Sequence, residues 1–325
     1  MYGEIALLSG TANRPLAEAI SRELKVPLIG ADVFKFPNQN IFCRLHTSVR
    51  GKDVFVIQPT CATEHDDGSL ASVNDNLMEL LIMIDTLRRD SAGRITAVVP
   101  YYGYGRTDKK DQPRVPITAR LVADLISAAG ASRFLTLDLH AGQIQGFFSI
   151  PVDELTAFHI LSEYFRAKEI PDAAVIAADI GATKRARNFA AALDIPLAII
   201  EKRRVQRPDG STAKALNVIG DVQGKNVIIF DDEIDTAGTV TQAIIFLKAS
   251  GANQVYVCAT HPIFSDPAVE RLCSVDIDEI VVTDTVPLPP RKRLTNMAVL
   301  SVAPLLAEVI RRIHLGISVG ALFNE

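Results

Sequence analysis

Residues Val227–Val240, with the sequence VIIFDDEIDTAGTV, carry the strongest structural signal of the chain. The first four residues form an apolar run without alternation, which is typical of a strand buried on both faces of a parallel sheet. The run ends in two acids, Asp231 and Asp232, and the turn Asp235–Thr239 then opens a helix. Ligands of parallel α/β sheets bind beyond the carboxyl ends of the strands, so this stretch predicts both a fold class and a binding site.

The turn Asp235–Thr239 has the residue types that a phosphate group requires. A helix N-terminus offers unpaired N–H groups and the positive end of the helix dipole. Gly238 lets the backbone approach the anion, and the threonine hydroxyls of the turn can donate hydrogen bonds. Asp231 and Asp232 would repel a phosphate but can accept hydrogen bonds from sugar hydroxyls. The expected ligand is therefore a sugar phosphate, and the alternative interpretation is an ordinary N-capping loop.

Short apolar runs alternate with amphipathic stretches along the whole chain, a pattern that predicts parallel sheets with right-handed crossovers. The apolar runs predict strands at Ile5–Leu8, Val54–Gln58, Ile95–Val99, Phe134–Asp138, Ala174–Ala177, Leu197–Ile200, Val227–Phe230, Gln254–Ala259 and Glu279–Val282. The amphipathic stretches predict helices near Asp75–Arg89, Pro116–Ala129, Ala157–Lys168, Thr183–Leu193, Thr239–Ser250 and Ala303–His314. Irregular connections are expected at Thr63–Val73, Arg204–Lys214 and Pro287–Thr295.

The strand–loop–helix pattern occurs twice, in Ile95–Gly130 and in Val227–Gly251, and the length of 325 residues suits two domains. We therefore expect an α/β fold with domains at 1–151 and 152–302, and a C-terminal helix, 303–315, that packs on the first domain.

The composition excludes several classes of protein. Lys and Arg number 34 and Asp and Glu 38, and the resulting net charge of -4 argues against a general nucleic-acid or membrane-surface binder. The first residues, MYGEIALLSG, lack the basic region of a signal peptide. The four cysteines form no CxxC pattern, so we expect reduced thiols and a cytoplasmic protein.

The stretch Asp231–Thr239 resembles the phosphoribosyl diphosphate loop of type I phosphoribosyltransferases and of the ribose-phosphate diphosphokinase family. The similarity to the diphosphokinase family covers nearly the whole chain and implies two phosphoribosyltransferase-like domains, each a mainly parallel sheet flanked by helices. It rests on the segments NDNLMELL (74–81), RITAVVPYYGYGR (94–106), DLHAGQIQGFF (138–148), EKRR (201–204), ATHPIFS (259–265) and AEVIRRIHLGISVGALF (307–323).

The resemblance implies a transferase of the nucleotide-biosynthesis pathways. Enzymes of this family transfer diphosphate from ATP to the 1-hydroxyl of ribose 5-phosphate and release AMP. The implied cofactor is Mg²⁺, and the implied partners are the two substrates, without nucleic acid or membrane. The family has active sites near subunit interfaces, which implies a homo-oligomer built of dimers, up to a hexamer.

The resemblance also implies a role for individual residues. Catalysis is expected from Lys202 and Arg204. Ribose 5-phosphate is expected on Arg204, Asp231, Asp232, Asp235, Thr236, Ala237, Gly238 and Thr239. ATP is expected on Phe36, Asn38, Gln39, Asn40, Arg106, Thr107 and His140, with Phe36 packing on the adenine of a neighbouring subunit. Metal ligands are expected at Asp138, His140 and Asp179.

Residue patterns alone leave simpler interpretations open for some of these positions. Asp138 and His140 lie two apart, so they point the same way if the backbone there is extended, but a histidine that merely caps a strand end is equally plausible. Lys202 and Arg204 could be an exposed basic strand end, and Phe36 an ordinary buried aromatic residue.

Two positions depart from the family pattern and define one of two functional alternatives. Asn40 stands where the family usually has Glu, and Thr107 where it has Gln. Both lie in the nucleotide segments, so one alternative is a weakly active or non-catalytic regulatory paralogue. The other is a phosphoribosyltransferase that consumes phosphoribosyl diphosphate, against which the segments 74–81 and 138–148 argue.

Overall fold

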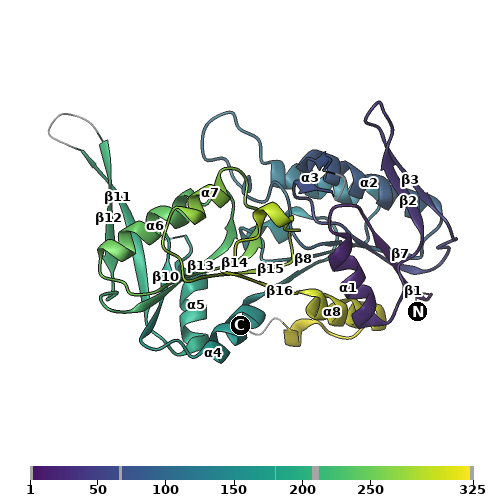
Figure 1. The fold of residues 1–325 in the computed structure, drawn as a ribbon. Helices are drawn as coiled ribbons and strands as arrows, with labels where there is room; N and C mark the ends of the chain where they lie inside the picture. The colour runs from purple at the N-terminus through teal and green to yellow at the C-terminus, as the bar shows by residue number, and fades with distance from the viewer. Residues whose placement is uncertain (1–2, 66–67, 180, 207–211, 323–325) are drawn as a thin grey trace. The chain divides into compact units, whose positions relative to one another are not determined.

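The computed structural model describes residues 3–65, 68–179, 181–206 and 212–322; at 202–206, 212–215 and 321 it describes the backbone alone. The chain forms two compact units (Figure 1). Unit 1 comprises Met1–Thr156, Thr285–Pro287 and Ser301–Asn324, and unit 2 comprises Ala157–Asp284 and Leu288–Leu300. The chain therefore returns to unit 1 after completing the sheet of unit 2.

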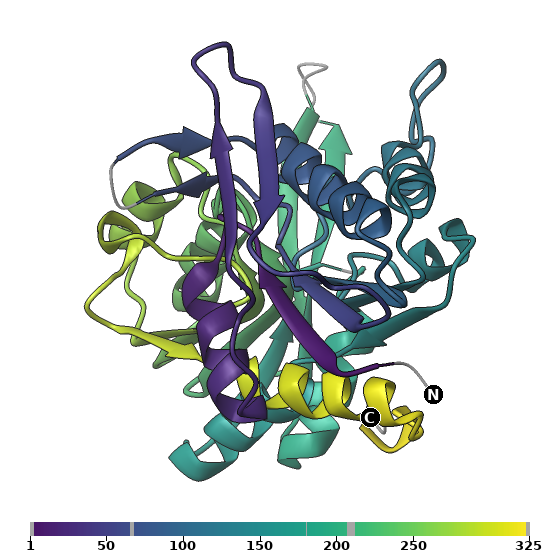
Figure 2. The ribbon, with the colours of Figure 1, turned by 90° about the vertical axis from the view of Figure 1, so that its right-hand side faces the viewer.

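Unit 1 is built on a parallel sheet with the strand order β1-β4-β7-β8-β9. The strands are β1 (Ile5–Ser9), β4 (Asp53–Ile57), β7 (Arg94–Val99), β8 (Arg133–Leu137) and β9 (Val152–Leu155). The helices are α1 (Arg14–Leu24), α2 (Val73–Arg89), α3 (Thr118–Ala129) and α8 (Ala303–Leu315), with 3-10 turns η1 (Gly142–Phe147) and η3 (Gly320–Leu322). Figure 2 shows α8 beside α1, with which it is in contact.

Two antiparallel hairpins complete unit 1. The first joins β2 (Ala31–Lys35) to β3 (Ile41–Leu45), and β3 packs against α2. Its tip projects away from the five-stranded sheet (Figure 2). The second hairpin joins the short strands β5 (Thr63–Glu64) and β6 (Leu70–Ala71) just before α2. Both hairpins therefore lie next to α2.

Unit 2 is built on a seven-stranded sheet with the order β12-β11-β10-β13-β14-β15-β16, parallel except at β12. The strands are β10 (Ala173–Ala177), β11 (Leu197–Gln206), β12 (Thr212–Ile219), β13 (Asn226–Ile234), β14 (Val255–Pro262), β15 (Glu279–Thr283) and β16 (Met297–Leu300). The helices are α4 (Phe158–Lys168), α5 (Thr183–Leu193), α6 (Gly238–Ala249) and α7 (Ala268–Cys273), with the 3-10 turn η2 (Pro290–Lys292).

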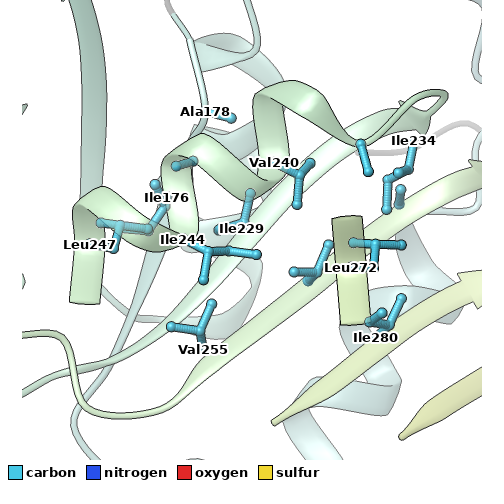
Figure 3. Close-up of a cluster of buried hydrophobic side chains, with 14 of the residues drawn as sticks. Ile176, Ala178, Ile229, Ile234, Val240, Ile244, Leu247, Val255, Leu272 and Ile280 are labelled. Carbon is cyan, nitrogen blue, oxygen red and sulfur yellow. The ribbon is translucent and has the colours of Figure 1, made fainter. Parts of the chain in front are cut away.

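Strand β13 lies in the middle of the unit 2 sheet, and its side chains are buried on both faces of the sheet. Ile229 belongs to the apolar cluster beneath α6, which also includes Ile244 (Figure 3). The next residue points the opposite way, and the ring of Phe230 stacks on Phe189 of α5 at a centroid distance of 4.2 Å. Burial of an apolar side chain of this size contributes about 1.5–3 kcal/mol. Apolar contacts on both faces of the sheet therefore hold the end of β13 in place, where Asp231 and Asp232 lie.

The fold confirms the expected α/β class, and every expected strand and helix is present within a few residues. The expectation of an irregular segment at Arg204–Lys214 is wrong at both ends of that segment. Backbone pairing of β11 with β12 reaches Gln206 and resumes at Thr212, and residues 207–211 lie outside the described residues. The expectation of an irregular segment at Thr63–Val73 is also wrong in part, because the short strands β5 and β6 lie within it. Polar strands that pair at a sheet edge lack the apolar run on which the expectation was based.

Several elements are present that the sequence analysis did not predict, namely α1, α7, β2, β3, β9 and β16. Apart from α1, they are short, lie at sheet edges, or belong to hairpins. The domain limits 151/152 stay a prediction; the compact units divide at 156/157, because β9 pairs with β8 inside unit 1.

Candidate functional site

The acidic pair of unit 2 lies at the carboxyl end of β13, between the parallel neighbours β10 and β14. Asp231 is half-buried and Asp232 is buried, with 5% of its surface exposed. The backbone N–H of Asp232 donates to Oδ1 of Asp231 at 2.9 Å. Two adjacent carboxyl groups are therefore held at the strand end by the backbone itself.

Electrostatic repulsion is concentrated on Asp231. Burial, and then the neighbouring carboxyl groups of Asp232 and Asp179, raise the pKa of Asp231 well above its usual range. Asp232 is partly neutralised by Arg185 of α5, whose Nη1 lies 3.1 Å from its Oδ2. Hydroxyl groups that donate hydrogen bonds, or a cation, would relieve this repulsion.

The N-terminus of α6 is adjacent to the acidic pair and has no side-chain cap within the described chain. Its N-cap residue, Ala237, has φ +58° and carries no polar group. By contrast, α2 is closed by a reciprocal capping box between Ser72 and Asp75. The first N–H groups of α6 are thus available to an external acceptor, which is the arrangement of an anion site.

The loop before α5 supplies the third carboxylate of this region. Oδ1 of Asp179 accepts a hydrogen bond from the backbone N–H of Ala182 at 3.0 Å. Asp179 also contributes to the raised pKa of Asp231, so the structure brings together these two predicted residues of unit 2.

The corresponding turn of unit 1 follows β7 and carries Arg106 and Thr107. Tyr104 has φ +66°, a conformation that is uncommon for a residue with a large side chain. Its carbonyl accepts from both the hydroxyl of Thr107, at 2.6 Å, and the N–H of Thr107, at 2.9 Å. The N–H of Gly103 donates to Oγ1 of Thr60 at 2.7 Å, which ties the turn to the end of β4. These bonds anchor the turn, and Arg106 is one of its exposed residues.

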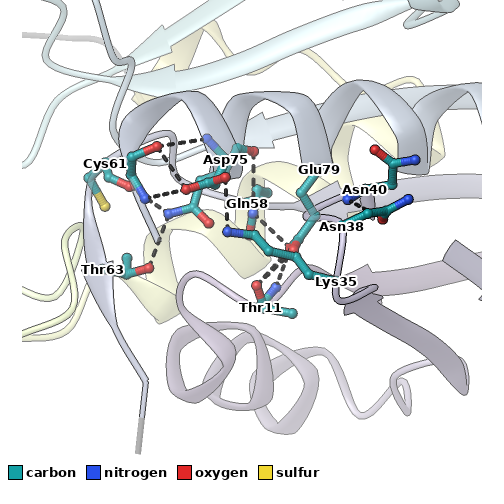
Figure 4. A network of polar contacts seen from close by, with 11 residues as sticks. Thr11, Lys35, Asn38, Asn40, Gln58, Cys61, Thr63, Asp75 and Glu79 are labelled. Carbon is teal, nitrogen blue, oxygen red and sulfur yellow. Dashed lines mark hydrogen bonds and ion pairs between the residues drawn. The ribbon is translucent and has the colours of Figure 1, made fainter. Parts of the chain in front are cut away.

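Helix α2 connects the two nucleotide segments that the sequence predicts. The hydroxyl of Tyr104 donates to Oδ1 of Asn74. Nζ of Lys35, at the end of β2, lies 2.9 Å from Oδ1 of Asp75 (Figure 4). That contact and the capping bonds of Ser72 lower the pKa of Asp75 to about 2. The hairpin and the Arg106 turn are thus both attached to the first turn of α2.

Phe36 is an exposed aromatic residue, so its interpretation as an ordinary buried side chain is wrong. It is 42% exposed, and its ring contacts Phe34 and Phe42 with centroids 5.2 and 5.6 Å away. The N–H of Phe36 donates to the carbonyl of Asn40, and the N–H of Asn40 donates to Oδ1 of Asn38 (Figure 4). Gln39 completes the turn with φ +69°. The hairpin tip therefore presents an aromatic face and three amide side chains.

Asp138 and His140 do not lie on an extended segment as expected. Strand β8 ends at Leu137, and Asp138 has φ +36°, so the two side chains do not share a face by strand alternation. The N–H of the intervening Leu139 donates to Oε1 of Glu154 at 3.0 Å. Both residues still follow β8, which lies beside β7 and the Arg106 turn.

Lys202 and Arg204 lie in the backbone ladder of β11, opposite Leu216 and Lys214 of β12. Their side chains lie outside the described residues, so the choice between a catalytic pair and a basic strand end stays open.

Comparison with known proteins assigns the chain to a family. The model of the N-terminal domain of ribose phosphate pyrophosphokinase matches residues 5–130, and that of the phosphoribosyl synthetase-associated domain matches residues 203–324. Ribose-phosphate pyrophosphokinases of Caldanaerobacter subterraneus and Campylobacter jejuni are 52% and 49% identical, each over 98% of both chains. The crystal structure of phosphoribosylpyrophosphate synthetase from Mycobacterium smegmatis is 42% identical, with a TM-score of 0.88 over 97% of this chain and 100% of that chain.

The chain belongs to the ribose-phosphate pyrophosphokinase family. This confirms the family resemblance, the fold of two mainly parallel sheets flanked by helices, and the prediction of a diphosphate transferase. The regulatory paralogue is not favoured. In the part of the chain that the structure describes, each helix is too short or too polar to cross a bilayer.

Ribose-phosphate pyrophosphokinase membership does not by itself point to the residues that hold the site in shape. Arg185, Arg271 and Asn74 contact the acidic pair, the phosphate loop and the Arg106 turn, respectively. Each comes from a helix remote in sequence from its partner, so no local pattern could have identified it. In the sequence, the only signal was the change from an apolar run to polar residues before each amphipathic stretch, which indicated that helix N-termini lie near the predicted site.

The donor groups fit a magnesium ion that is shared with substrate. Among the described residues, no group of three His, Cys, Asp or Glu side chains is placed to hold a metal. Mg²⁺ is usually held by one or two carboxylates together with waters and substrate phosphates, rather than by a protein cage. In unit 2, the repulsion that Asp232 and Asp179 exert on Asp231 suits that mode of binding.

Proposed function

We propose that the protein transfers the diphosphate group of ATP to the 1-hydroxyl of ribose 5-phosphate, which yields phosphoribosyl diphosphate and AMP. The observation that carries the proposal is the open N-terminus of α6 directly beside the acidic end of β13. An anion site adjacent to hydrogen-bond acceptors is complementary to a molecule with a phosphate at one end and hydroxyls at the other.

The sugar phosphate would bind to unit 2 in one orientation. Its 5-phosphate accepts hydrogen bonds from the backbone and hydroxyls of Asp235, Thr236, Ala237, Gly238 and Thr239. Its 2- and 3-hydroxyls donate to Asp231 and Asp232. The opposite orientation would place the phosphate against two carboxylates, which is unfavourable by charge. The anomeric 1-hydroxyl is thereby directed away from the helix N-terminus.

The transfer itself is an in-line displacement at phosphorus. The oxygen of the 1-hydroxyl forms a bond to the β-phosphorus of ATP, the bond from that phosphorus to the α,β-bridging oxygen breaks, and AMP leaves with that electron pair. The hydroxyl proton is lost to solvent. Lys202 and Arg204 would stabilise the charge on the phosphate oxygens, and catalysis is mainly positioning and charge neutralisation.

ATP would be held by the unit 1 segments. Arg106 and Thr107 would contact its phosphates and ribose, and Phe36 would stack on the adenine, with Asn38, Gln39 and Asn40 at the hairpin tip beside it. We propose that this hairpin serves a neighbouring subunit, in a homo-oligomer of dimers or a hexamer. The exposed rings of Phe34 and Phe42 agree with a face that is covered in an assembly.

In unit 1, Asp138 and His140 would hold magnesium together with phosphate oxygens of ATP; in unit 2, Asp179 would hold a second ion or lie beside the ribose phosphate group. When bound, it neutralises phosphate charge and holds the chain of oxygens in a fixed geometry. We place the reaction in the cytoplasm, where ATP and reduced thiols are available; the four cysteines are not in disulfides.

The direct test is to incubate the purified protein with ATP, Mg²⁺ and ribose 5-phosphate and to measure AMP and phosphoribosyl diphosphate. We expect both products in equal amounts, and neither without ribose 5-phosphate. Absence of AMP, or AMP formation that does not depend on the sugar, would contradict the proposal. Consumption of phosphoribosyl diphosphate with a nucleobase would instead support a phosphoribosyltransferase.

A further inference from the structure

Helix α7 contributes an arginine to the back of the phosphate loop. Nη1 of Arg271 donates a hydrogen bond to the carbonyl oxygen of Thr236 at 2.9 Å. The two residues are 35 positions apart in sequence, and α7 packs against α6, the helix that the loop opens. The side chain therefore reaches the loop through tertiary packing.

This hydrogen bond fixes the orientation of one peptide group. The carbonyl of Thr236 and the N–H of Ala237 belong to the same planar trans peptide, so they point in opposite directions. When Arg271 holds the carbonyl on one side, the N–H of Ala237 is presented on the other. Ala237 is the N-cap of α6, and its N–H precedes the unpaired N–H groups of the first helical turn.

The local backbone needs such a restraint. Ala237 has φ +58°, the left-handed conformation that a residue with a Cβ adopts at a cost of about 1–3 kcal/mol. Left-handed residues at a helix start turn successive N–H groups into one concavity that binds anions. A guanidinium bound to the preceding carbonyl offsets part of that cost.

The guanidinium of Arg271 also lies close to Gly238. A Cβ placed on Gly238 would lie 3.2 Å from Nη1 of Arg271, so the guanidinium would have to shift by a few tenths of an ångström. A side chain at 238 would therefore disturb the hydrogen bond between Arg271 and Thr236.

We propose that Arg271 is a positioning residue for ribose 5-phosphate: by holding the Thr236 carbonyl it aims the N–H groups of the loop at the 5-phosphate. The inference rests on the proposed binding of the sugar phosphate to this loop. It assigns Arg271 no contact with the substrate, and the positive charge behind the loop adds a smaller attraction for the phosphate.

Arg166 offers a matched control in the same unit. Its Nη2 donates to the carbonyl of Ala192 at 2.7 Å, at the C-terminal end of α5, where arginine satisfies unpaired helix carbonyls. The chemistry of the two bonds is the same, and only the Arg271 bond holds a peptide of the phosphate loop. Arg166→Met therefore measures the general effect of losing such a bond.

The test measures the affinity for ribose 5-phosphate alone by calorimetry, without ATP. Arg271→Met should raise the dissociation constant about tenfold, which is the loss of about 1.4 kcal/mol that a charge-assisted hydrogen bond supplies. Arg271→Lys keeps a donor and should recover affinity to within about threefold of wild type. The KM for ATP should stay within twofold in both, and Arg166→Met should bind the sugar like wild type. A folded Arg271→Met protein with wild-type affinity would overturn the proposal.

A second measurement needs no variant and covers the case in which Arg271→Met does not fold. Hydrogen exchange of wild-type amides at 237–239 should slow when ribose 5-phosphate is added and remain unchanged with ribose, which lacks the phosphate. Equal exchange with and without ribose 5-phosphate would overturn the proposal. The AMP assay is independent: protection without AMP formation would refute the transferase reaction and leave the role of Arg271 standing.

Discussion

The turn after β7 in unit 1 and the turn after β13 in unit 2 both connect a parallel strand to a helix, but they differ in length and in the groups that they expose. Both strands lie between two parallel neighbours, and each turn leads into a helix. The first connection runs through residues 100–117, while the second needs only residues 235–237. The long turn presents side chains to solvent, and the short turn presents backbone N–H groups beside two acids.

Both turns contain left-handed residues that carry a side chain: Tyr104 and Arg114 in the long turn, and Ala237 in the short one. In each turn a carbonyl beside such a residue accepts a hydrogen bond. The carbonyl of Tyr104 accepts from Thr107 within the same turn. The carbonyl before Ala237 accepts from Arg271 on another helix. The long turn combines this internal bond with tertiary contacts to Thr60 and Asn74, whereas the carbonyl of the short turn is held by a tertiary contact. Under the proposed function, the first turn would offer side chains to a nucleotide and the second would offer backbone N–H groups to a sugar phosphate.

The largest effect is expected from a segment outside both turns. Lys202→Ala should lower kcat about 10²–10³-fold, because a charge that stabilises the transferring phosphates is lost. Affinity for ribose 5-phosphate should change less than threefold, since the phosphate loop is intact. Steady-state kinetics and calorimetry separate the two. Lys168→Ala, which removes the contact to Glu279, is the control. Full turnover of Lys202→Ala would contradict the proposed role of Lys202 in stabilising the charge on the phosphates.

Asp231→Asn tests the acid-flanked turn and should raise the dissociation constant of ribose 5-phosphate about 10–100-fold. The reason is the loss of charged acceptors for the sugar hydroxyls, each hydrogen bond to a charged group contributing about 1.5–3 kcal/mol. Calorimetry without ATP gives the value. Asp221→Asn, at an exposed position of the same unit, should have no effect on affinity. Unchanged affinity in Asp231→Asn would break the proposed sugar orientation.

The same variant should be more stable than wild type at neutral pH. Burial and neighbouring carboxylates raise the pKa of Asp231 in the folded state, so its ionisation destabilises the fold as the pH rises above its ordinary value of 3.8. Asp231→Asn should raise Tm at pH 7 by about 2–4 °C, the shift that about 1 kcal/mol produces in a domain of this size. The difference should disappear below pH 3.8, where the carboxyl is protonated in both folded and unfolded chains. A difference that persists there would assign the gain to packing.

Tyr104→Phe tests whether the turn after β7 in unit 1 affects the binding of ATP. It removes the hydrogen bond to Asn74 without changing the ring, and should raise the KM for ATP about fivefold, as expected for about 1 kcal/mol. The KM for ribose 5-phosphate should not change. Tyr164→Phe, which removes a bond to Glu279 at 2.7 Å, is the matched control. Equal changes in both KM values would mean that the turn does not act on the nucleotide alone.

The smallest effect concerns the two helix N-termini. Ser72→Ala removes the capping box of α2 and should cost about 1 kcal/mol of stability, seen as a lower Tm. Ser127→Ala, in the last turn of α3, loses only a bond to the carbonyl of Ala123 and should change Tm little. An unchanged Tm in Ser72→Ala would mean that the capping box of α2 contributes no stability. The capped N-terminus of α2 and the uncapped N-terminus of α6 would then not differ in stability on this account.

Sequence reasoning predicted the local structure correctly where the residue chemistry and the backbone pattern coincide. At 227–240 the apolar run, the acids and the glycine-bearing turn are contiguous, and β13, the turn and α6 follow in that order. It failed at Asp138, where the chain leaves β8 with φ +36° instead of staying extended. It also failed for β12, because a polar edge strand is recognisable only through its partner β11.

The sequence by itself determined the class of fold and the order of strand, turn and helix at 227–240, because buried strands, helix N-termini and acidic strand ends are encoded in consecutive residues. Tertiary structure decided how the site is held: Arg185 against Asp232, Arg271 behind Thr236, and Asn74 on Tyr104. Each of these pairs joins residues at least 30 positions apart. Such contacts depend on how helices pack on a sheet, and local propensities carry no information about that packing.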